Sequence, residues 1–201
     1  MNRRQMLLTT PLALMPGTPR AMIDTAANQN AGPDELVIAD FARAGNVSDV
    51  PGDWQGFSDR VMGGVSDARF GTDTIEGVPC IRLAGRVTRD SGGGFVQMAR
   101  YFGPGRDGLD AAAYRGLKLT VYGNDEEYNV HLRTGDVRWY EQSYRATFFA
   151  PAAWTEIALP WSAFQPNALD VPLDTSRILR IGWLCWMREF MADLALPRMP
   201  A

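Results

Sequence analysis

The chain has 201 residues, of which 46% are hydrophobic, and it contains 20 Gly, 13 Pro and six Trp. A chain of this length and composition buries a sizeable core without disulfides or metals, so we expect one folded domain rich in turns. The net charge of -3 provides no basic field for a phosphate backbone, which argues against a nucleic-acid partner.

The first 35 residues are predicted to be a signal peptide or a tail without fixed structure, ending in a linker rich in Ala, Asn and Gln. Arg3 and Arg4 precede an apolar run, residues 6–15, in the order typical of a bacterial twin-arginine export signal. That run is too short to span a bilayer, so no transmembrane segment is expected in the mature chain. Arg20 follows the run and no clean Ala-x-Ala cleavage site is present, which keeps an unprocessed tail as the alternative. Export predicts a periplasmic protein, whereas an unprocessed tail predicts one that is cytoplasmic or peripheral at the inner membrane.

Short segments in which apolar and polar residues alternate recur between clusters of Gly, Pro, Asp and Asn over residues 36–199. This spacing predicts a single all-β domain, an antiparallel sandwich or barrel. The predicted strands cover residues 35–41, 79–87, 94–102, 116–123, 127–133, 142–149, 154–161, 177–187 and 189–199. The last two are close enough in sequence to pair across a tight turn. The one predicted helical segment is residues 109–114, about one and a half turns long.

Two of these strands, residues 127–133 and 142–149, each carry an apolar row and a polar row, because side chains alternate between the faces of a sheet. If the two strands pair as a hairpin, their polar rows share one outward face, and the connecting loop carries two aromatic residues. The residues of this hypothetical binding face are Asn129, His131, Arg133, Trp139, Tyr140 and Arg145. Aromatic rings supply contact area and polar groups orient a ligand, so the face suits ligand binding. A solvated sheet surface is the alternative, because antiparallel sheets commonly have one.

No catalytic residue is predicted. His131 is the sole histidine, and no G-x-S-x-G motif surrounds a serine, so the sequence assembles no nucleophilic triad. The segment GPGRDG, residues 103–108, matches the dinucleotide-binding pattern, and Asp125 follows at a suitable spacing. A dinucleotide fold, however, needs a helix of about three turns after the glycines and a strand buried on both faces, and residues 109–123 provide neither. We therefore interpret residues 103–108 as a loop and expect no cofactor.

The sequence also predicts no metal site. Cys80 and Cys185 lie far apart and lack the paired spacing of zinc or redox motifs. The acidic run at residues 125–127 is typical of a solvated turn. The acids Asp67 and Asp73 follow no calcium-binding spacing, although loop carboxylates suit that ion. Whether the two cysteines form a disulfide stays open at this stage.

The segment from Trp54 to Phe70, WQGFSDRVMGGVSDARF, fits no regular element, because it contains two adjacent glycines, Gly63 and Gly64. Its pattern W-x4-D-R-V-M-G-G-V-S resembles the signature of the complex I intermediate-associated protein family. The resemblance continues through GGGFVQMA and the later segments YRGLKLTVYG, YNVHLRT, YRATF, WTEIALPWSAF and RIGWLCW, and it covers residues 36–197.

The resemblance implies a galactose-binding-like jelly-roll β-sandwich over residues 36–199. It also implies a non-enzymatic protein that assists assembly of respiratory complex I through contacts with a protein partner. Structural or partner-binding roles then fall to the motif residues Trp54, Asp59, Met62, Gly63, Gly64, Ser66, Gly93, Gly94 and Phe95. The chain departs from many relatives in two places: Ser91 stands before the glycines in place of Asn, and Arg100 lies five residues beyond Phe95. A carbohydrate-binding module of an exported protein is the alternative function, because related jelly rolls bind sugars on a sheet face.

The glycine pair is expected to form a turn at the rim of the sandwich. In that turn, Met62 and Val65 would tuck against the sandwich, while Asp59 and Ser66 would bond loop amides. An exposed turn of this kind also presents bare amides to a partner, so the same loop is a candidate interaction site.

Overall fold

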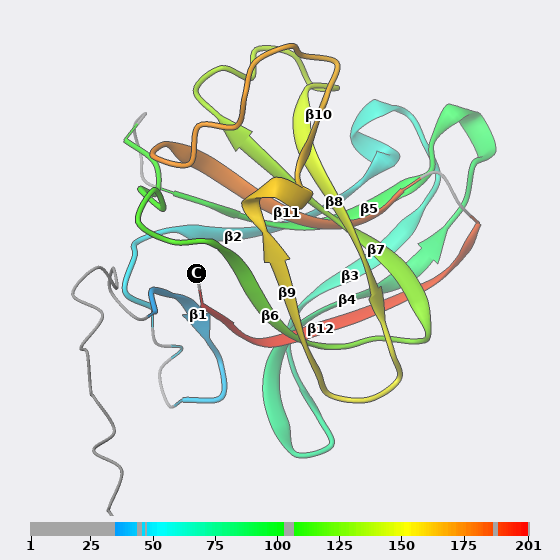
Figure 1. Cartoon of the computed structure of the whole chain (residues 1–201). Helices are drawn as coiled ribbons and strands as arrows, with labels where there is room; N and C mark the ends of the chain where they lie inside the picture. Colours follow the sequence, from blue (N-terminus) through cyan, green and yellow to red (C-terminus); the bar gives the residue numbers. More distant parts are fainter. Residues whose placement is uncertain (1–34, 44–45, 47, 103–106, 187–188, 201) are drawn as a thin grey trace, which may run out of the picture. The chain divides into compact units, whose positions relative to one another are not determined.

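The strands lie in two antiparallel six-stranded sheets that pack face to face, which confirms the predicted β-sandwich (Figure 1). The computed structural model describes residues 35–43, 46, 48–102, 107–186 and 189–200, all within one structural unit, residues 32–201. The predicted export signal lies outside the described residues, as do residues 103–106 of the GPGRDG segment. No helix in the described part of the chain has the length and apolar character needed to cross a membrane.

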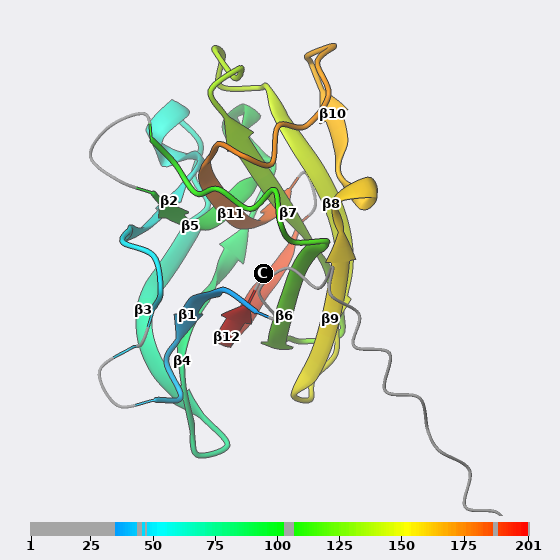
Figure 2. The same ribbon diagram turned by 60° about the vertical axis from the view of Figure 1, so that its left-hand side comes forward.

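Sheet A contains β1 (Val37–Asp40), β3 (Asp67–Ile75), β4 (Val78–Val87), β6 (Gly116–Tyr122), β9 (Thr155–Pro160) and β12 (Phe190–Pro200). Its strand order is β3-β4-β12-β6-β9, and β1 also pairs with β12. Sheet B contains β2 (Asp53–Ser58), β5 (Phe95–Tyr101), β7 (Glu126–Thr134), β8 (Ser143–Ala150), β10 (Gln165–Asn167) and β11 (Ile178–Trp186). Its order is β10-β8-β7-β11-β5-β2, and Figure 2 shows sheet B above sheet A. Three short 3-10 helices, η1 (Asp59–Met62), η2 (Asp90–Gly92) and η3 (Trp161–Ala163), lie between strands.

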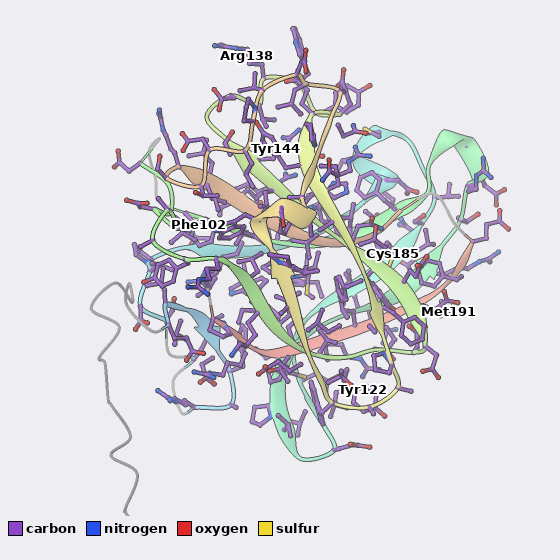
Figure 3. The ribbon with its side chains drawn as sticks, viewed as in Figure 1. Phe102, Tyr122, Arg138, Tyr144, Cys185 and Met191 are labelled. Carbon is purple, nitrogen blue, oxygen red and sulfur yellow. The ribbon has the colours of Figure 1, made fainter. Side chains whose placement is uncertain are left out.

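Apolar side chains on the facing sides of the two sheets form the core, as the alternation of side chains along a strand requires. Residues at most 2% exposed include Leu117, Leu119 and Val121 from sheet A, and Tyr128, Val130 and Leu132 from sheet B. Burying one such side chain contributes about 1.5–3 kcal/mol, so these rows hold the two sheets together. Figure 3 shows the side chains of the domain, with the core residues Tyr144 and Cys185 labelled.

Nine predicted strands are confirmed, with bounds shifted by no more than two residues. Three strands were missed, namely β2, β3 and β10. All three are edge strands of their sheets, and most of their residues are exposed or half-buried. An edge strand needs no buried row as regular as that of an inner strand, which explains why its alternation is weak.

Two expectations about local structure are wrong. Residues 109–114 form no helix, because Leu109 is held in an isolated β-bridge with Ile178 and a turn follows, in which Tyr114 N donates to Ala111 O at 3.1 Å. The last two strands do not pair with each other. β11 pairs with β5 and β7 in sheet B, whereas β12 pairs with β4 and β6 in sheet A. Both edges of each strand are already hydrogen-bonded, so the chain crosses from one sheet to the other between them.

Candidate functional site

The signature turn follows β2 and is held from inside by one buried carboxylate. Asp59 begins η1 and is 0% exposed. Its oxygens accept hydrogen bonds from Ser66 N at 2.9 Å, Ser66 Oγ at 2.5 Å and Gly94 N at 2.6 Å. Burial raises the pKa of Asp59, but the hydrogen bonds from Ser66 and Gly94 outweigh burial, so the pKa lies below its usual value. Asp59 therefore joins the M-G-G-V-S segment to the G-G-F segment.

This carboxylate also explains the glycine pair. Gly63 ends η1 with a φ of 90°, in the left-handed region that favours glycine. A Cβ atom at Gly64 would lie 2.3 Å from Asp59 Cγ, and one at Gly93 would lie 2.2 Å from Asp59 Oδ2. Any side chain at either position would displace the carboxylate. The expected bonds to loop amides are confirmed, since Ser66 Oγ also accepts from Thr88 N at 3.1 Å.

The expectation that Met62 and Val65 tuck against the sandwich is wrong. Val61, Met62 and Val65 are 70%, 55% and 47% exposed, respectively. The Asp59 carboxylate occupies the interior of the turn, so the apolar side chains of the turn point outward. We call Val61, Met62 and Val65 the η1 apolar patch.

Two aromatic residues of the motif support the fold. Trp54 packs on Trp183 with 5.3 Å between ring centroids, and the Arg100 guanidinium lies 5.7 Å from the centroid of the Trp54 ring. Phe95 is 8% exposed, and its ring meets that of Phe57 edge-on, with 6.2 Å between centroids. Both side chains are therefore engaged within the domain.

The predicted hairpin of β7 and β8 is confirmed, and its polar rows lie on the same side of sheet B. Asn129 pairs with Thr147, and His131 pairs with Arg145, across the two strands. This side faces away from the core, because the alternate residues of β7 are fully buried within the core. We call it the polar face of sheet B. His131 lies in the floor of this face and is only 6% exposed.

The predicted arginines of this face hold the loop between β7 and β8. Arg133 Nη2 donates to Trp139 O at 2.8 Å and to Tyr140 O at 2.6 Å. Arg145 Nη2 donates to Glu141 O at 3.1 Å. The loop presents Trp139 and Tyr140, which are 66% and 78% exposed. Figure 3 shows this loop at the top of the view, where the label marks Arg138.

Residues of β5 and β11 also reach the polar face, and sequence reasoning missed them. In the register of the sheet they include Gln97, Tyr101, Arg180 and Gly182, beside the buried Ala99 and Leu184. Arg180 lies opposite Arg133 on β7 and opposite Tyr101 on β5, while Gly182 lies opposite His131. No signal within a single strand reveals these neighbours, because strands far apart in the chain bring them together.

The polar face carries positive charge around a neutral histidine. Burial, and then the charges of the surrounding arginines, lower the pKa of His131 to about 3. The imidazole is therefore neutral at neutral pH. Burial, and then the charge of Arg180, lower the pKa of Arg133 to about 10, so its guanidinium stays protonated.

Two hollows among the described residues lie away from the polar face. One of about 490 Å³ lies beside Asp73 and Cys80, and one of about 240 Å³ lies beside Thr88 and Met191. Burial raises the pKa of the Cys80 thiol to about 11, which keeps it protonated. Cys80 and Cys185 lie in different sheets and form no disulfide. Within the described ranges, no three His, Cys, Asp or Glu side chains gather as metal ligands would.

Solved structures with this fold include two carbohydrate-binding modules. The Family 11 module from Clostridium thermocellum, in complex with a β-1,3-1,4-mixed-linked tetrasaccharide, has a TM-score of 0.61 and 13% identity, covering 83% of this chain and 94% of the module. The Family 30 module of the cellulosomal cellulase Cel9D-Cel44B of the same organism has a TM-score of 0.56 and 15% identity, covering 83% of this chain and 95% of the module. At these identities the likeness shows the jelly-roll β-sandwich fold alone.

No curated protein matches the chain. The family model of complex I intermediate-associated protein 30 (CIA30) matches residues 40–189. This match covers most of the chain and includes the signature turn, both glycine motifs and the strands of the polar face. The chain therefore belongs to the CIA30 family.

Proposed function

We propose that this protein is a non-enzymatic assembly factor that binds a protein partner through the η1 apolar patch. The observation that carries the proposal is that Val61, Met62 and Val65 are exposed on a turn whose interior is fixed by Asp59. Apolar side chains that gather at the surface are typical of protein interaction sites. Membership of the CIA30 family supports a partner among the subunits of respiratory complex I.

The rigidity of the turn supports this proposal. Asp59 accepts hydrogen bonds from Ser66, Gly94 and Phe95, and Gly64 lies directly against its carboxylate. A loop that is ordered before binding loses little conformational entropy when a partner docks. Burial of the η1 apolar patch against a partner then removes apolar surface from water with little opposing cost.

The state of the side chains most suited to catalysis supports a non-enzymatic role. His131 has a pKa of about 3 and is a poor general base near neutral pH. The Asp59 carboxylate is fully buried and surrounded by hydrogen-bond donors. The Cys80 thiol has a pKa of about 11, so it supplies little thiolate for nucleophilic attack.

Co-purification from membranes tests the proposal. The tagged full-length protein should recover membrane-arm or quinone-module subunits of complex I, quantified by mass spectrometry. Val61→Asp should reduce that recovery about ten-fold, because it introduces a charge into an apolar contact. Val171→Asp is the matched control, since Val171 is 44% exposed in a loop elsewhere. A folded Val61→Asp variant with undiminished recovery would contradict the proposal.

Carbohydrate binding is a second candidate function. Trp139 and Tyr140 are exposed beside the polar side chains of sheet B, a combination that stacks on sugar rings and bonds their hydroxyls. The Family 11 module that shares this fold was solved with a tetrasaccharide. Glycan-array binding that Trp139→Ala abolishes would favour this function over the first. Sequencing the mature N-terminus would show whether the protein is exported, as a module acting on extracellular glycans must be.

A further inference from the structure

The polar face of sheet B places two arginines directly opposite each other. Arg180 on β11 pairs with Arg133 on β7 in the register of the sheet. Like charges at such positions repel each other. Within the described ranges, neither arginine takes part in an ion pair. Asp53, which lies opposite Tyr101, and Glu141, whose charge acts on Arg133, are exposed, and neither forms an ion pair with these arginines among the described residues.

Two hydrogen-bond donors on the same face have no acceptor among the described residues. Arg180 Nε and Gln97 Nε2 are buried, and neither has a hydrogen-bond partner in the part of the chain that the structure describes. Gln97 is 4% exposed, and its amide lies over β11, since a Cβ atom at Gly182 would be 1.9 Å from Gln97 Nε2. Gly182 and Arg180 are two positions apart on the same side of β11, so both donors lie over one strip of the sheet. Buried donors without acceptors destabilise a fold, which points to a ligand that supplies the acceptors.

We propose that this strip binds a carboxylate side chain from an acidic polypeptide segment. A carboxylate supplies two acceptor oxygens and relieves the repulsion between Arg180 and Arg133. The planar guanidinium of Arg180 matches a carboxylate. Its Nη1 donates to Tyr101 Oη at 3.2 Å, while its Nε has no hydrogen-bond partner among the residues that the structure describes.

The surroundings of the two arginines favour a polypeptide over an acidic sugar. On one side, the Arg180 guanidinium lies 5.9 Å from the centroid of the Phe57 ring, and Phe57 lies just before η1 with its apolar patch. On the other side, Arg133 holds the loop that exposes Trp139 and Tyr140. Figure 1 shows η1 and this loop at opposite sides of sheet B. The aliphatic side chains of the η1 apolar patch cannot stack on a sugar ring. They suit a polypeptide segment that has acidic residues at its centre and apolar residues on both sides.

This inference rests on the proposed function in that the partner is a protein, and it adds to the η1 apolar patch a contact of the partner with Arg180 and Arg133. Binding of a labelled synthetic peptide to the full-length protein, measured by fluorescence anisotropy, tests it. One peptide has a Glu-Asp-Glu centre flanked by Leu and Phe, and its counterpart has a Gln-Asn-Gln centre. The acidic peptide should bind about ten-fold more tightly, and this advantage should shrink at high salt.

Three variants assign the effect to the strip. Arg180→Gln should abolish the advantage of the acidic peptide. Arg180→Lys should lose it several-fold, because an ammonium group cannot bind a carboxylate through two parallel hydrogen bonds. Arg69→Gln removes an exposed arginine of β3 and should leave the advantage unchanged. Melting temperatures establish whether each variant is folded. If Arg180→Gln does not fold, the binding of the two peptides to Arg180→Lys decides the outcome.

Equal affinity of the two peptides for the wild type, or an unchanged advantage in folded Arg180 variants, would overturn the inference. Oligogalacturonate that binds more tightly than the acidic peptide would also overturn it, in favour of an acidic glycan. The two proposals fail separately. If Val61→Asp abolishes recovery of subunits while the Arg180 variants change nothing, the proposed function stands and this inference falls. If the acidic peptide requires Arg180 while Val61→Asp leaves recovery unchanged, the inference stands and the docking role of the η1 apolar patch falls.

Discussion

The signature turn and the polar face of sheet B differ in how their buried polar groups are satisfied. In the turn, the Asp59 carboxylate accepts hydrogen bonds from three residues. On the polar face, Gln97 and Arg180 keep buried donors without acceptors among the described residues, and Arg180 stands opposite Arg133. The first arrangement stabilises the folded state, whereas the second opposes it, as binding sites commonly do. The comparison separates residues that hold the fold from residues available for a ligand.

The strongest test of the signature turn is Gly64→Val. The added Cβ would lie 2.3 Å from Asp59 Cγ, so the variant should lose about 3 kcal/mol of stability or misfold. A loss of that size corresponds to a fall of about 9 °C in the melting temperature of a domain of this length. Gly71→Val is the control, because a Cβ atom there meets nothing within 4 Å. Equal melting temperatures for Gly64→Val and the wild type would rule out the close-approach account.

Asp59→Asn tests the charge of the buried carboxylate. The amide places a donor where only acceptors fit, so stability should fall by about 2 kcal/mol at pH 7. Because the folded-state pKa of Asp59 is lowered, the stability that its charge contributes is complete above the ordinary pKa of about 4. That stability is lost as pH falls from about 4 through the lower folded-state pKa. Urea unfolding between pH 7 and pH 3 should therefore show a smaller acid-induced loss in Asp59→Asn than in the wild type. The exposed carboxyl of Asp174 provides the control, and Asp174→Asn should change stability far less.

The polar face should give the domain a pH dependence that one residue controls. The folded-state pKa of His131 is about 3, so the unfolded chain binds its proton first as pH falls below about 6.5. Stability contributed by the neutral imidazole is thus complete above about pH 6.5, and about 2 kcal/mol of it is lost by about pH 5. Because His131 is the sole histidine, His131→Gln should flatten the urea-unfolding profile between these values. A profile that keeps its slope in the variant would contradict burial of a neutral imidazole.

Gln97→Leu should have the smallest effect and the opposite sign to the turn variants. Replacing the buried amide removes a donor that has no acceptor among the described residues, so stability should rise by about 1 kcal/mol. Gln55→Leu, at an exposed position of the neighbouring β2, is the control and should change stability by less than about 0.5 kcal/mol. A loss of stability in Gln97→Leu would mean that the amide is satisfied in the folded protein, and the contrast with the turn would disappear.

Alternation of apolar and polar residues was sufficient to predict the inner strands, because β6 and β7 each bury a regular apolar row. The same rule missed β2 and β3, where edge positions leave many residues exposed and Gly56 and Gly71 interrupt the pattern. The helix at residues 109–114 was expected from local composition alone. Local composition carries no information about Ile178, whose bridge holds Leu109 in an extended conformation.

The candidate site was predictable only where neighbours in space are also neighbours in the chain. The rows of β7 and β8 belong to one hairpin, so their shared face followed from the alternation. Gln97 and Arg180 come from strands that are far apart in sequence, and their register depends on the whole fold. The family resemblance identified Asp59 as a motif residue but did not predict that it is buried, because an acid beside glycines in a loop is ordinarily solvated. Since the Asp59 carboxylate was not expected inside the turn, Met62 and Val65 were wrongly expected to face inward.

The topology of the two sheets has a consequence for biosynthesis. β11 lies between β5 and β7, and β12 lies between β4 and β6, so each sheet receives a central strand from residues 178–200. While a ribosome is making the chain, β4 and β5 keep one edge open until those residues emerge. Pairing across such long sequence separations is slow, and open strand edges invite aggregation. Neither sheet of a newly made chain can therefore close before residues 178–200 have been synthesised.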